Sequence, residues 1–369
     1  MSAPDCLPFT TLLIIPTGVA AQIGGFAGDA IPVARTLASL SDRLITHPNV
    51  MNGAQLYWPI PNALYVEGYG LDQFAAGRWQ LVPVRRNRIG LVLDRGMRSD
   101  LKVRQLQAAD AAQATLGLSI TGVAQTDRPL NVRLHRAQSG AAWGTLEHPD
   151  SLLRAADHLL RTQSVDAIAV IVQFPETLDD QALADYRQGK GVDPLAGAEA
   201  VISHLVVREF QRPCAHAPAL SPLPLDRTLS PRSAAEELGY TFLPSVLVGL
   251  SRAPQFILAS EHHRAAISGD QVSAVIVPAS CCGGSAVLSL AQQGTPIIAV
   301  TENSTAMDAF PEALGIQALV AQSYLEAVGI VAALKSGVEP GCLTCYTNPS
   351  LAATLEEGMA SSESPSMAL

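Results

Sequence analysis

The stretch VSAVIVPASCCGGSAVLSLAQQGTPIIAV, residues 272–300, is the clearest indication of the fold. Its first run, 272–278, is rich in Val and Ile and predicts a buried strand, and 285–293 has the apolar spacing of a helix. Gly294 suits the end of that helix, and a second Val/Ile run follows at 296–300. A strand, a helix and a strand in this order are typical of a parallel sheet that is covered on both faces.

The same alternation recurs along the chain. We expect further strands at 11–16, 88–94, 118–127 and 166–174, and further helices at 31–43, 100–116, 195–209 and 322–336. The sequence therefore predicts an α/β fold with a largely parallel sheet or sheets and helices on both faces, with two Rossmann-like halves as one form of it.

The length of 369 residues is enough for two domains. We expect an N-terminal α/β half over 1–150 that holds a long loop at 46–87, and a C-terminal α/β half over 151–345 that carries the Cys-Cys-Gly-Gly turn. A proline-rich loop at 211–233 is the second long one, and loops of such length often wall a binding site. The tail over 346–369 drifts into Ser, Glu, Pro and Met and is expected to be flexible.

Composition excludes several classes of partner. The net charge of −9 and the lack of a Lys/Arg stripe disfavour nucleic acid, and no apolar run is long enough to cross a membrane. Six cysteines in 369 residues are too few for a disulfide scaffold. We therefore expect a cytoplasmic protein with a small-molecule ligand, and the sequence leaves a homo-oligomer open.

The two adjacent cysteines are the strongest candidates for chemistry. Cys281 and Cys282 follow the expected strand and precede the expected helix, where the helix dipole favours a thiolate. The backbone amides of Gly283, Gly284 and Ser285 could hold a carboxylate or an oxyanion. The alternative is that both cysteines are small buried residues in a tight turn.

Other polar residues follow the expected strands or lie in the first long loop. Because ligands of open α/β sheets bind outside the carboxyl ends of the strands, we expect these residues to meet at one edge. Asp94, Asp127 and His47 are candidates for proton transfer, and Asn49 and Asn303 are candidates for binding. The alternative for each is an ordinary turn residue.

Two glycine-bearing segments could bind an anion. In GVAAQIGGFAGDA (18–30), Gly24 and Gly25 suit a phosphate cradle, although the spacing matches no dinucleotide or Walker motif; tight packing of a strand on a helix is the alternative. Arg187 lies in a second glycine-rich segment that leads into a helix and could grip an anionic group.

A local resemblance to the aspartate/glutamate racemase and maleate isomerase superfamily rests on AVIVPASC, GGSAVLSLAQQG and TPIIAV. It implies a catalytic cysteine at the end of a strand and a second cysteine from the opposite domain. Cys214 is the candidate for that second cysteine, but the Asn-Thr that usually follows it is lacking here. His216 nearby could form a Cys–His pair with the site, and a single such pair is insufficient for a metal.

Three longer segments carry a wider resemblance: THPNVMNGAQLYWPIPNALYVEGYGLD, YRQGKGVDPLAGAEAVISHLVVREFQRPCAHAPALSPLPLD and SPRSAAEELGYTF. They resemble domain-of-unknown-function family 3326, which occurs mainly in cyanobacteria and other photosynthetic lineages. The resemblance covers nearly the whole chain and implies no activity.

The residues favour a cofactor-independent enzyme that acts on a small anionic metabolite through an activated cysteine. A racemase, isomerase, lyase or amide hydrolase would each fit. The alternative is a nucleotide- or phosphate-binding regulatory protein without catalysis.

Overall fold

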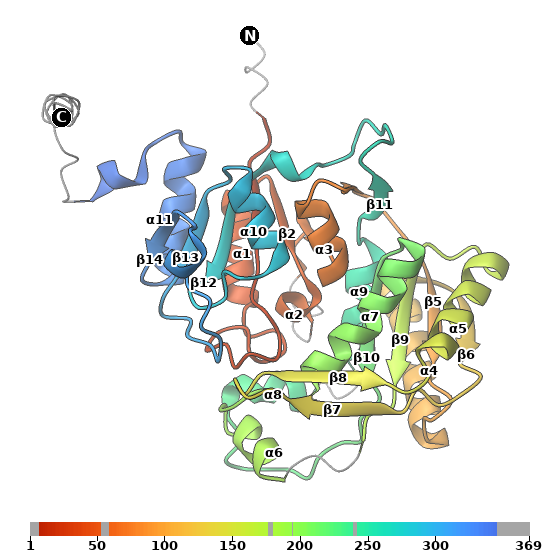
Figure 1. The fold of residues 1–369 in the computed structure, drawn as a ribbon. Helices are drawn as coiled ribbons and strands as arrows, with labels where there is room; N and C mark the ends of the chain where they lie inside the picture. Colours follow the sequence, from red (N-terminus) through yellow and green to blue (C-terminus); the bar gives the residue numbers. More distant parts are fainter. Residues whose placement is uncertain (1–6, 53–58, 176–179, 194, 239–241, 345–369) are drawn as a thin grey trace, which may run out of the picture.

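The computed structural model describes residues 7–52, 59–175, 180–193, 195–238 and 242–344. Two separate parallel sheets form its framework (Figure 1). The larger is built from β1 (Thr10–Leu13), β2 (Arg43–Thr46), β3 (Ala63–Tyr65), β12 (Val272–Pro278), β13 (Ile297–Val300) and β14 (Ala318–Ala321). The smaller is built from β5 (Arg88–Leu93), β6 (Ser119–Gln125), β9 (Ala167–Val172) and β10 (Cys214–Pro218).

The strand order is β14-β13-β12-β1-β2-β3 in the six-stranded sheet and β10-β9-β5-β6 in the four-stranded sheet, and neighbours in both run parallel. The expected α/β class with parallel sheets is therefore confirmed. Each sheet draws strands from both sides of residue 150, and the division into domains at the expected boundaries stays a prediction. The expected flexible tail, 346–369, lies outside the described residues.

Helices cover the sheets. Around the larger sheet lie α1 (Ile31–Leu40), α10 (Ser285–Gln292) and α11 (Tyr324–Lys335) (Figure 1). Around the smaller sheet lie α4 (Ser99–Leu116), α5 (Pro149–Thr162), α7 (Ala196–Phe210) and α9 (Leu243–Ser251). The unit β12-α10-β13 is the strand, helix and strand expected from 272–300.

Neither of the two expected long loops is a loop throughout. Residues 46–87 hold α2 (Pro48–Met51), β3, α3 (Gly68–Ala75) and β4 (Trp79–Val82), and β4 pairs antiparallel with β11 (Gln255–Leu258). Residues 211–233 hold β10 and the start of α8 (Pro231–Leu238). The sequence of β10, Cys-Ala-His-Ala-Pro, lacks a Val/Ile run, and its pairing with β9 makes it a strand.

The two sheets share their hydrophobic core. All six residues of β9 are buried, and alternate side chains enter two different clusters: Ile168 and Val170 enter the first, and Ala169 and Ile171 the second. Leu12 of β1 joins the first cluster and Leu13 joins the second. Each cluster thus spans both sheets, and this common core fixes the position of one sheet relative to the other.

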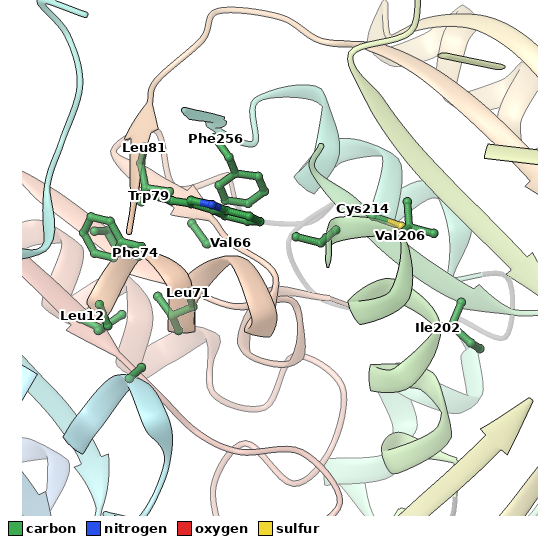
Figure 2. Close-up of a cluster of buried hydrophobic side chains, with 14 of the residues drawn as sticks. Leu12, Val66, Leu71, Phe74, Trp79, Leu81, Ile202, Val206, Cys214 and Phe256 are labelled. Carbon is green, nitrogen blue, oxygen red and sulfur yellow. The ribbon is translucent and has the colours of Figure 1, made fainter. Parts of the chain in front are cut away.

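Part of the first cluster lies between α3 and α7 (Figure 2). Trp79 lies beside Phe256 on the side of α3, with ring centroids 5.3 Å apart. Val206 of α7 and Cys214 of β10 lie together at the other end of the cluster. This apolar packing joins α7, which belongs to the smaller sheet, to elements of the larger sheet.

Helix α7 also lies against the hairpin of β7 (Val132–Arg136) and β8 (Ala142–Leu146) at very short range. A Cβ added to Gly197 would lie 2.1 Å from the backbone oxygen of Ala142, and one added to Gly144 would lie 2.3 Å from the Cβ of Ala198. The hairpin therefore fixes the first turn of α7 in position.

The substitution Gly197→Ala is expected to lower the free energy of unfolding by about 1–3 kcal/mol, because the new methyl group meets backbone atoms. The matched control is Gly329→Ala in α11, where an added Cβ meets no atom within 4 Å. The control should be neutral or stabilise by about 0.5–1 kcal/mol through helix propensity. Urea unfolding measures both, and equal stability of the two variants would contradict the close packing.

Candidate functional site

A cavity of about 670 Å³ lies between the two sheets. Both sheets contribute residues at or just after the carboxyl ends of their strands. From the larger sheet and its connections come Pro16, Thr17, Gly25, His47, Asn49, Glu67, Asp72, Cys281 and Gly284. From the smaller sheet and its connections come Arg98, Gln173, Phe174, Arg187, Asp193, Glu199, Ser203, His204, His216 and Leu220. Its volume is in the range typical of small-molecule sites.

The cavity brings together only part of the expected site. The expected residues that line it are Gly25, His47, Asn49, Arg187, His216, Cys281 and Gly284. Those that do not are Gly24, Asp94, Asp127, Cys214, Cys282, Gly283, Ser285 and Asn303.

Cys281 borders the cavity as a buried thiol, and its activation stays a prediction. Its side chain is 7% exposed, and its sulfur lies 3.2 Å from the hydroxyl of Thr305. Burial raises the pKa of this thiol, with hydrogen bonds from Thr305 and Ser280 opposing the shift. Helix α10 begins only at Ser285, so Cys281 lies in the turn before the helix.

Cys282 turns away from the cavity. It is fully buried, and its sulfur faces the backbone oxygen of Ala279 at 3.5 Å. Burial, together with the nearby Cys281 and Glu312, raises the pKa of Cys282 to about 12. Cys282 thus matches the second interpretation of the sequence, in which the cysteine is a small buried residue in a tight turn.

The first turn of α10 already has a carboxylate of the chain beside it. Asp72 of α3 accepts a hydrogen bond from the backbone N–H of Ala286. Burial raises the pKa of Asp72, and the charge of His204 opposes that rise. A ligand anion at this helix terminus would therefore meet the Asp72 carboxylate.

His47 and Asn49 hold backbone at the cavity wall. The Nε2 of His47 accepts the N–H of Ile15 at 3.0 Å, and burial lowers the pKa of His47 to about 4. The imidazole is therefore neutral at pH 7. The amide of Asn49 donates to the backbone oxygens of Ile15 and Gly24, at 3.1 and 2.9 Å. Both side chains stabilise the connection after β1.

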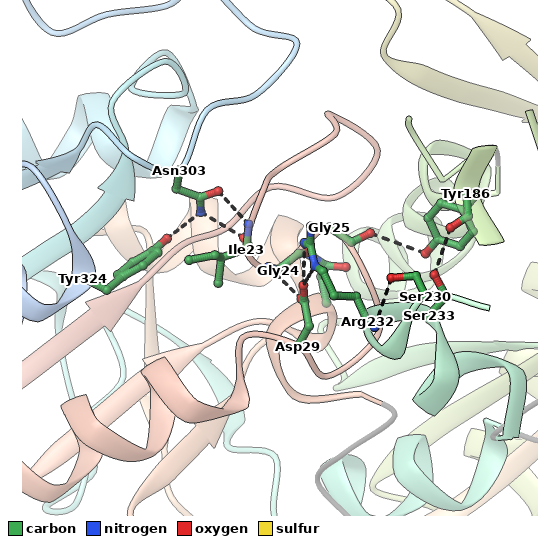
Figure 3. Close-up of polar contacts among 11 residues, drawn as sticks. Ile23, Gly24, Gly25, Asp29, Tyr186, Ser230, Arg232, Ser233, Asn303 and Tyr324 are labelled. Carbon is green, nitrogen blue, oxygen red and sulfur yellow. Dashed lines mark hydrogen bonds and ion pairs between the residues drawn. The ribbon is translucent and has the colours of Figure 1, made fainter. Parts of the chain in front are cut away.

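The glycine-rich segment 18–30 is closed onto the chain itself (Figure 3). The N–H of Gly24 donates to Asp29 at 2.7 Å, and Arg232 pairs with the same carboxylate at 2.8 Å. Asn303 bonds both the N–H and the oxygen of Ile23 at 2.9 Å. These contacts give Gly24 and Asn303 a structural role and place an acidic side chain where a phosphate cradle was expected.

Asp94 and Asp127 lie outside the cavity. Asp94 is 1% exposed and accepts the N–H groups of Gly96 and Leu130, both at 2.9 Å, so it fixes a turn. Asp127 lies at the surface after β6, an edge strand, and pairs with Arg154 at 2.8 Å. The hydrogen bond from Arg154 holds the pKa of Asp127 well below its usual range.

Cys214 is buried in the core and does not face Cys281 across the cavity. Its side chain is 1% exposed within the first hydrophobic cluster (Figure 2). Burial raises its pKa strongly. The arrangement of two opposed cysteines that the racemase resemblance implies is not formed by Cys281 and Cys214.

A cluster on α7 and β10 was missed in the sequence, apart from His216. The Nδ1 of His216 lies 3.2 Å from the hydroxyl of Ser203, and its Nε2 lies 3.6 Å from the carboxylate of Glu199. Glu199 and Ser203 are one helical turn apart, so both face the same side of α7. That spacing was visible in the sequence, but their pairing with His216 depends on the register of β10.

Asp193 completes the cluster. It accepts the N–H of Leu195 at 2.8 Å, and burial together with the charge of Glu199 raises the pKa of Asp193 to about 7. Asp193 therefore exchanges a proton with solvent near neutral pH, as acid–base groups in active sites do.

A second ion pair, between a buried carboxylate and a partly exposed histidine, lies on the neighbouring wall. His204 of α7 pairs with Glu67, which is 4% exposed and caps α3 by accepting the N–H of Tyr69 at 2.8 Å. Burial lowers the pKa of His204, but the hydrogen bond and charge of Glu67 raise it further, above its usual value. The apolar neighbours of His204 in the sequence are typical of a core histidine, but its side chain lies at the cavity and pairs with Glu67.

Arg187 does not present a free charge to the cavity. Its guanidinium pairs with Glu237 and donates to the backbone oxygen of Pro224 at 2.7 Å. Within the described residues, no group of three His, Cys, Asp or Glu side chains could hold a metal ion. None of the described helices has the length and apolar character needed to cross a membrane.

The comparisons with known proteins bear on the whole chain. The model of the family described as protein of unknown function DUF3326 matches residues 10–344. The chain belongs to this family. It is 60% identical over 335 residues to a protein named uncharacterized lipoprotein from Synechococcus sp. strain PCC 6301, covering 91% of this chain and 93% of that protein. No solved structure matches the chain.

Alkylation tests the burial of the thiols in this member of DUF3326. Cys342 is exposed, whereas Cys281 and Cys282 are buried with raised pKa values. Since the thiolate is the reactive form, iodoacetamide at neutral pH should modify Cys342 at least roughly tenfold faster than either. Mass spectrometry of the peptides gives each rate. Faster modification of Cys281 than of Cys342 would instead support the hypothesis that the Cys281 thiol is activated.

The raised pKa of Asp193 predicts how stability depends on pH. The folded state binds more protons than the unfolded state between about pH 4 and 7, so stability falls as the pH rises through this window. Asp193→Asn keeps the acceptor oxygen and removes the charge. Its melting temperature should exceed that of the wild type at about pH 8, and the gain should shrink towards pH 5. A gain that is larger at pH 5 would contradict the raised pKa.

Proposed function

We propose that the chain is an enzyme that acts on a small metabolite in the cavity between the sheets. The reaction would be a proton transfer of the kind that racemases, isomerases, lyases and amide hydrolases use. The observation that carries the proposal is His216, whose two ring nitrogens face Ser203 and Glu199 within the cavity. An oriented histidine beside a carboxylate is the usual arrangement for general acid–base catalysis.

The geometry leaves His216 available to a ligand. Its Nδ1 is close enough to the Ser203 hydroxyl for a hydrogen bond, which fixes the ring. The separation of 3.6 Å between Nε2 and Glu199 is longer than a hydrogen bond, so a ligand atom can interact with both groups. In this arrangement Nε2 takes a proton from the substrate or from water, and Glu199 stabilises the imidazolium that forms.

Cys281 is the second candidate for proton transfer. It borders the same cavity, and its raised pKa keeps the thiol protonated at neutral pH. It would therefore serve as a proton donor, or as a nucleophile only after a base removes its proton. The alternative, a nucleotide-binding protein, has less support. Its phosphate would need the N–H groups of the glycine-rich segment, and the N–H of Gly24 already donates to Asp29.

We further propose that the protein works in the cytoplasm. The four cysteines that the structure describes are free thiols, as is usual in a reducing compartment. The Synechococcus relative is named a lipoprotein, so cell fractionation is the relevant measurement. Recovery with the membrane fraction would contradict the cytoplasmic location.

Isotope exchange tests the enzymatic proposal without knowledge of the substrate. Pools of metabolites are incubated with the protein in D₂O or H₂¹⁸O, and mass spectrometry follows the label. The wild type should incorporate label into at least one metabolite. Glu199→Gln and His216→Gln should lower the rate roughly 10²-fold or more, the usual share of general acid–base catalysis.

Glu209→Gln is the control, since Glu209 lies on the same helix but is exposed to solvent. It should label at the rate of the wild type. Cys281→Ser shows whether the thiol takes part. Labelling that survives both Glu199→Gln and His216→Gln, or that is absent from every pool, would contradict the proposal.

A further inference from the structure

We infer that the cavity binds a molecule that carries a protonated amine, held by the carboxyl groups of Asp193 and Glu199. The inference rests on the proposed function in one respect, that the cavity is the ligand site. It differs from the sequence-based expectation of an anionic metabolite, and the distribution of charge in the cavity is the reason.

Most acidic side chains of the cavity already have a cation of the chain. Glu67 pairs with His204, and Glu237 pairs with Arg187. The positive charge of His204 also opposes the rise that burial causes in the pKa of Asp72. Buried carboxylates of this kind are neutralised within the protein and contribute little to the binding of a charged ligand.

Asp193 and Glu199 differ from these acids. Among the described residues, neither forms an ion pair with a Lys or Arg side chain. Asp193 accepts hydrogen bonds from the backbone N–H groups of Leu195 and Ala196, and the cation that Glu199 can pair with is His216, at 3.6 Å. Both groups line the cavity, so a ligand can supply the missing positive charge.

The start of α7 supplies backbone N–H donors that oppose the rise in the pKa of Asp193. Glu199 lies in the first turn of α7, and the hydrogen bonds to Asp193 come from backbone amides at that same end. The helix dipole stabilises negative charge there. Two carboxylates so placed attract an ammonium group, which offers three N–H donors to their oxygens.

The remainder of the wall fits an organic amine. Apolar side chains line the cavity on the side of the smaller sheet, among them Phe174, Leu195 and Phe242. Two guanidinium groups line the cavity on this side, and each is paired: Arg98 with Asp100 and Arg187 with Glu237. A ligand carboxylate would therefore compete with a carboxylate of the chain for either of them. The site thus favours a molecule with one ammonium group and an apolar body.

Three probes of nearly equal shape test the charge preference: benzylamine, benzyl alcohol and benzoate. Their affinities for the full-length protein are measured by ligand-observed NMR at about pH 8, where benzylamine carries a proton and Asp193 is mostly charged. Benzylamine should bind roughly tenfold or more tightly than benzyl alcohol, and benzoate should bind most weakly.

Substitutions show which carboxyl groups cause the preference for benzylamine. Glu199→Gln and Asp193→Asn should each reduce the ratio between benzylamine and benzyl alcohol, and the double variant should reduce it to about one. Glu209→Gln should keep the full ratio. A thermal unfolding curve of each variant confirms that it is folded, and the affinity for benzyl alcohol serves as an internal control for an intact cavity.

The inference is overturned if benzoate binds more tightly than benzylamine, if none of the probes binds at millimolar concentration, or if the preference survives in the double variant. Failure of the proposed function is a separate result. In that case benzylamine binds as expected while no metabolite takes up isotope label. Label uptake confined to metabolites without an amine, with no preference for benzylamine, would overturn the ligand class and leave the enzyme proposal intact.

Discussion

Parallel strands with both faces buried leave few places for polar side chains, and this constraint shapes the whole molecule. In β9 all six residues are buried, so polar groups of the smaller sheet reach the cavity from beyond the end of this strand or from the edge strand β10, which carries His216. The two sheets share both hydrophobic clusters, which fixes their carboxyl ends around one cavity. His47 and Cys281 reach this cavity from the larger sheet, and His216 reaches it from the smaller.

Charge inside the cavity is arranged in two ways. Some buried acids are paired with cations of the chain, as Glu67 is with His204, and these pairs hold α3 against α7. Others lack such a partner, and Asp193 shows the consequence in its raised pKa. The first kind of group maintains the geometry, and the second kind is available to a ligand or a proton. This distinction separates the structural residues of the cavity from the candidates for function.

Much of the architecture could be predicted because it depends on local patterns. The Val/Ile runs and helical spacing located β12, α10 and β13 within one or two residues. The sequence did not locate β10, because its small residues form a strand only when paired with β9. The sequence likewise did not indicate the raised pKa of Cys281, because that shift comes from burial, a property of the tertiary structure. Glu199 and Ser203 were overlooked because helical spacing alone does not identify the histidine that faces them.

A crystal structure of the protein, with its cavity in clear electron density, would show whether the two sheets form a ligand site. We expect the carboxyl ends of both sheets to enclose a single cavity, with the imidazole of His216 between Ser203 and Glu199. Ordered water or a small molecule should lie against the Asp193 and Glu199 carboxyl groups. A structure in which side chains fill this space, or in which the sheets separate and leave His216 and Glu199 open to bulk solvent, would contradict this expectation.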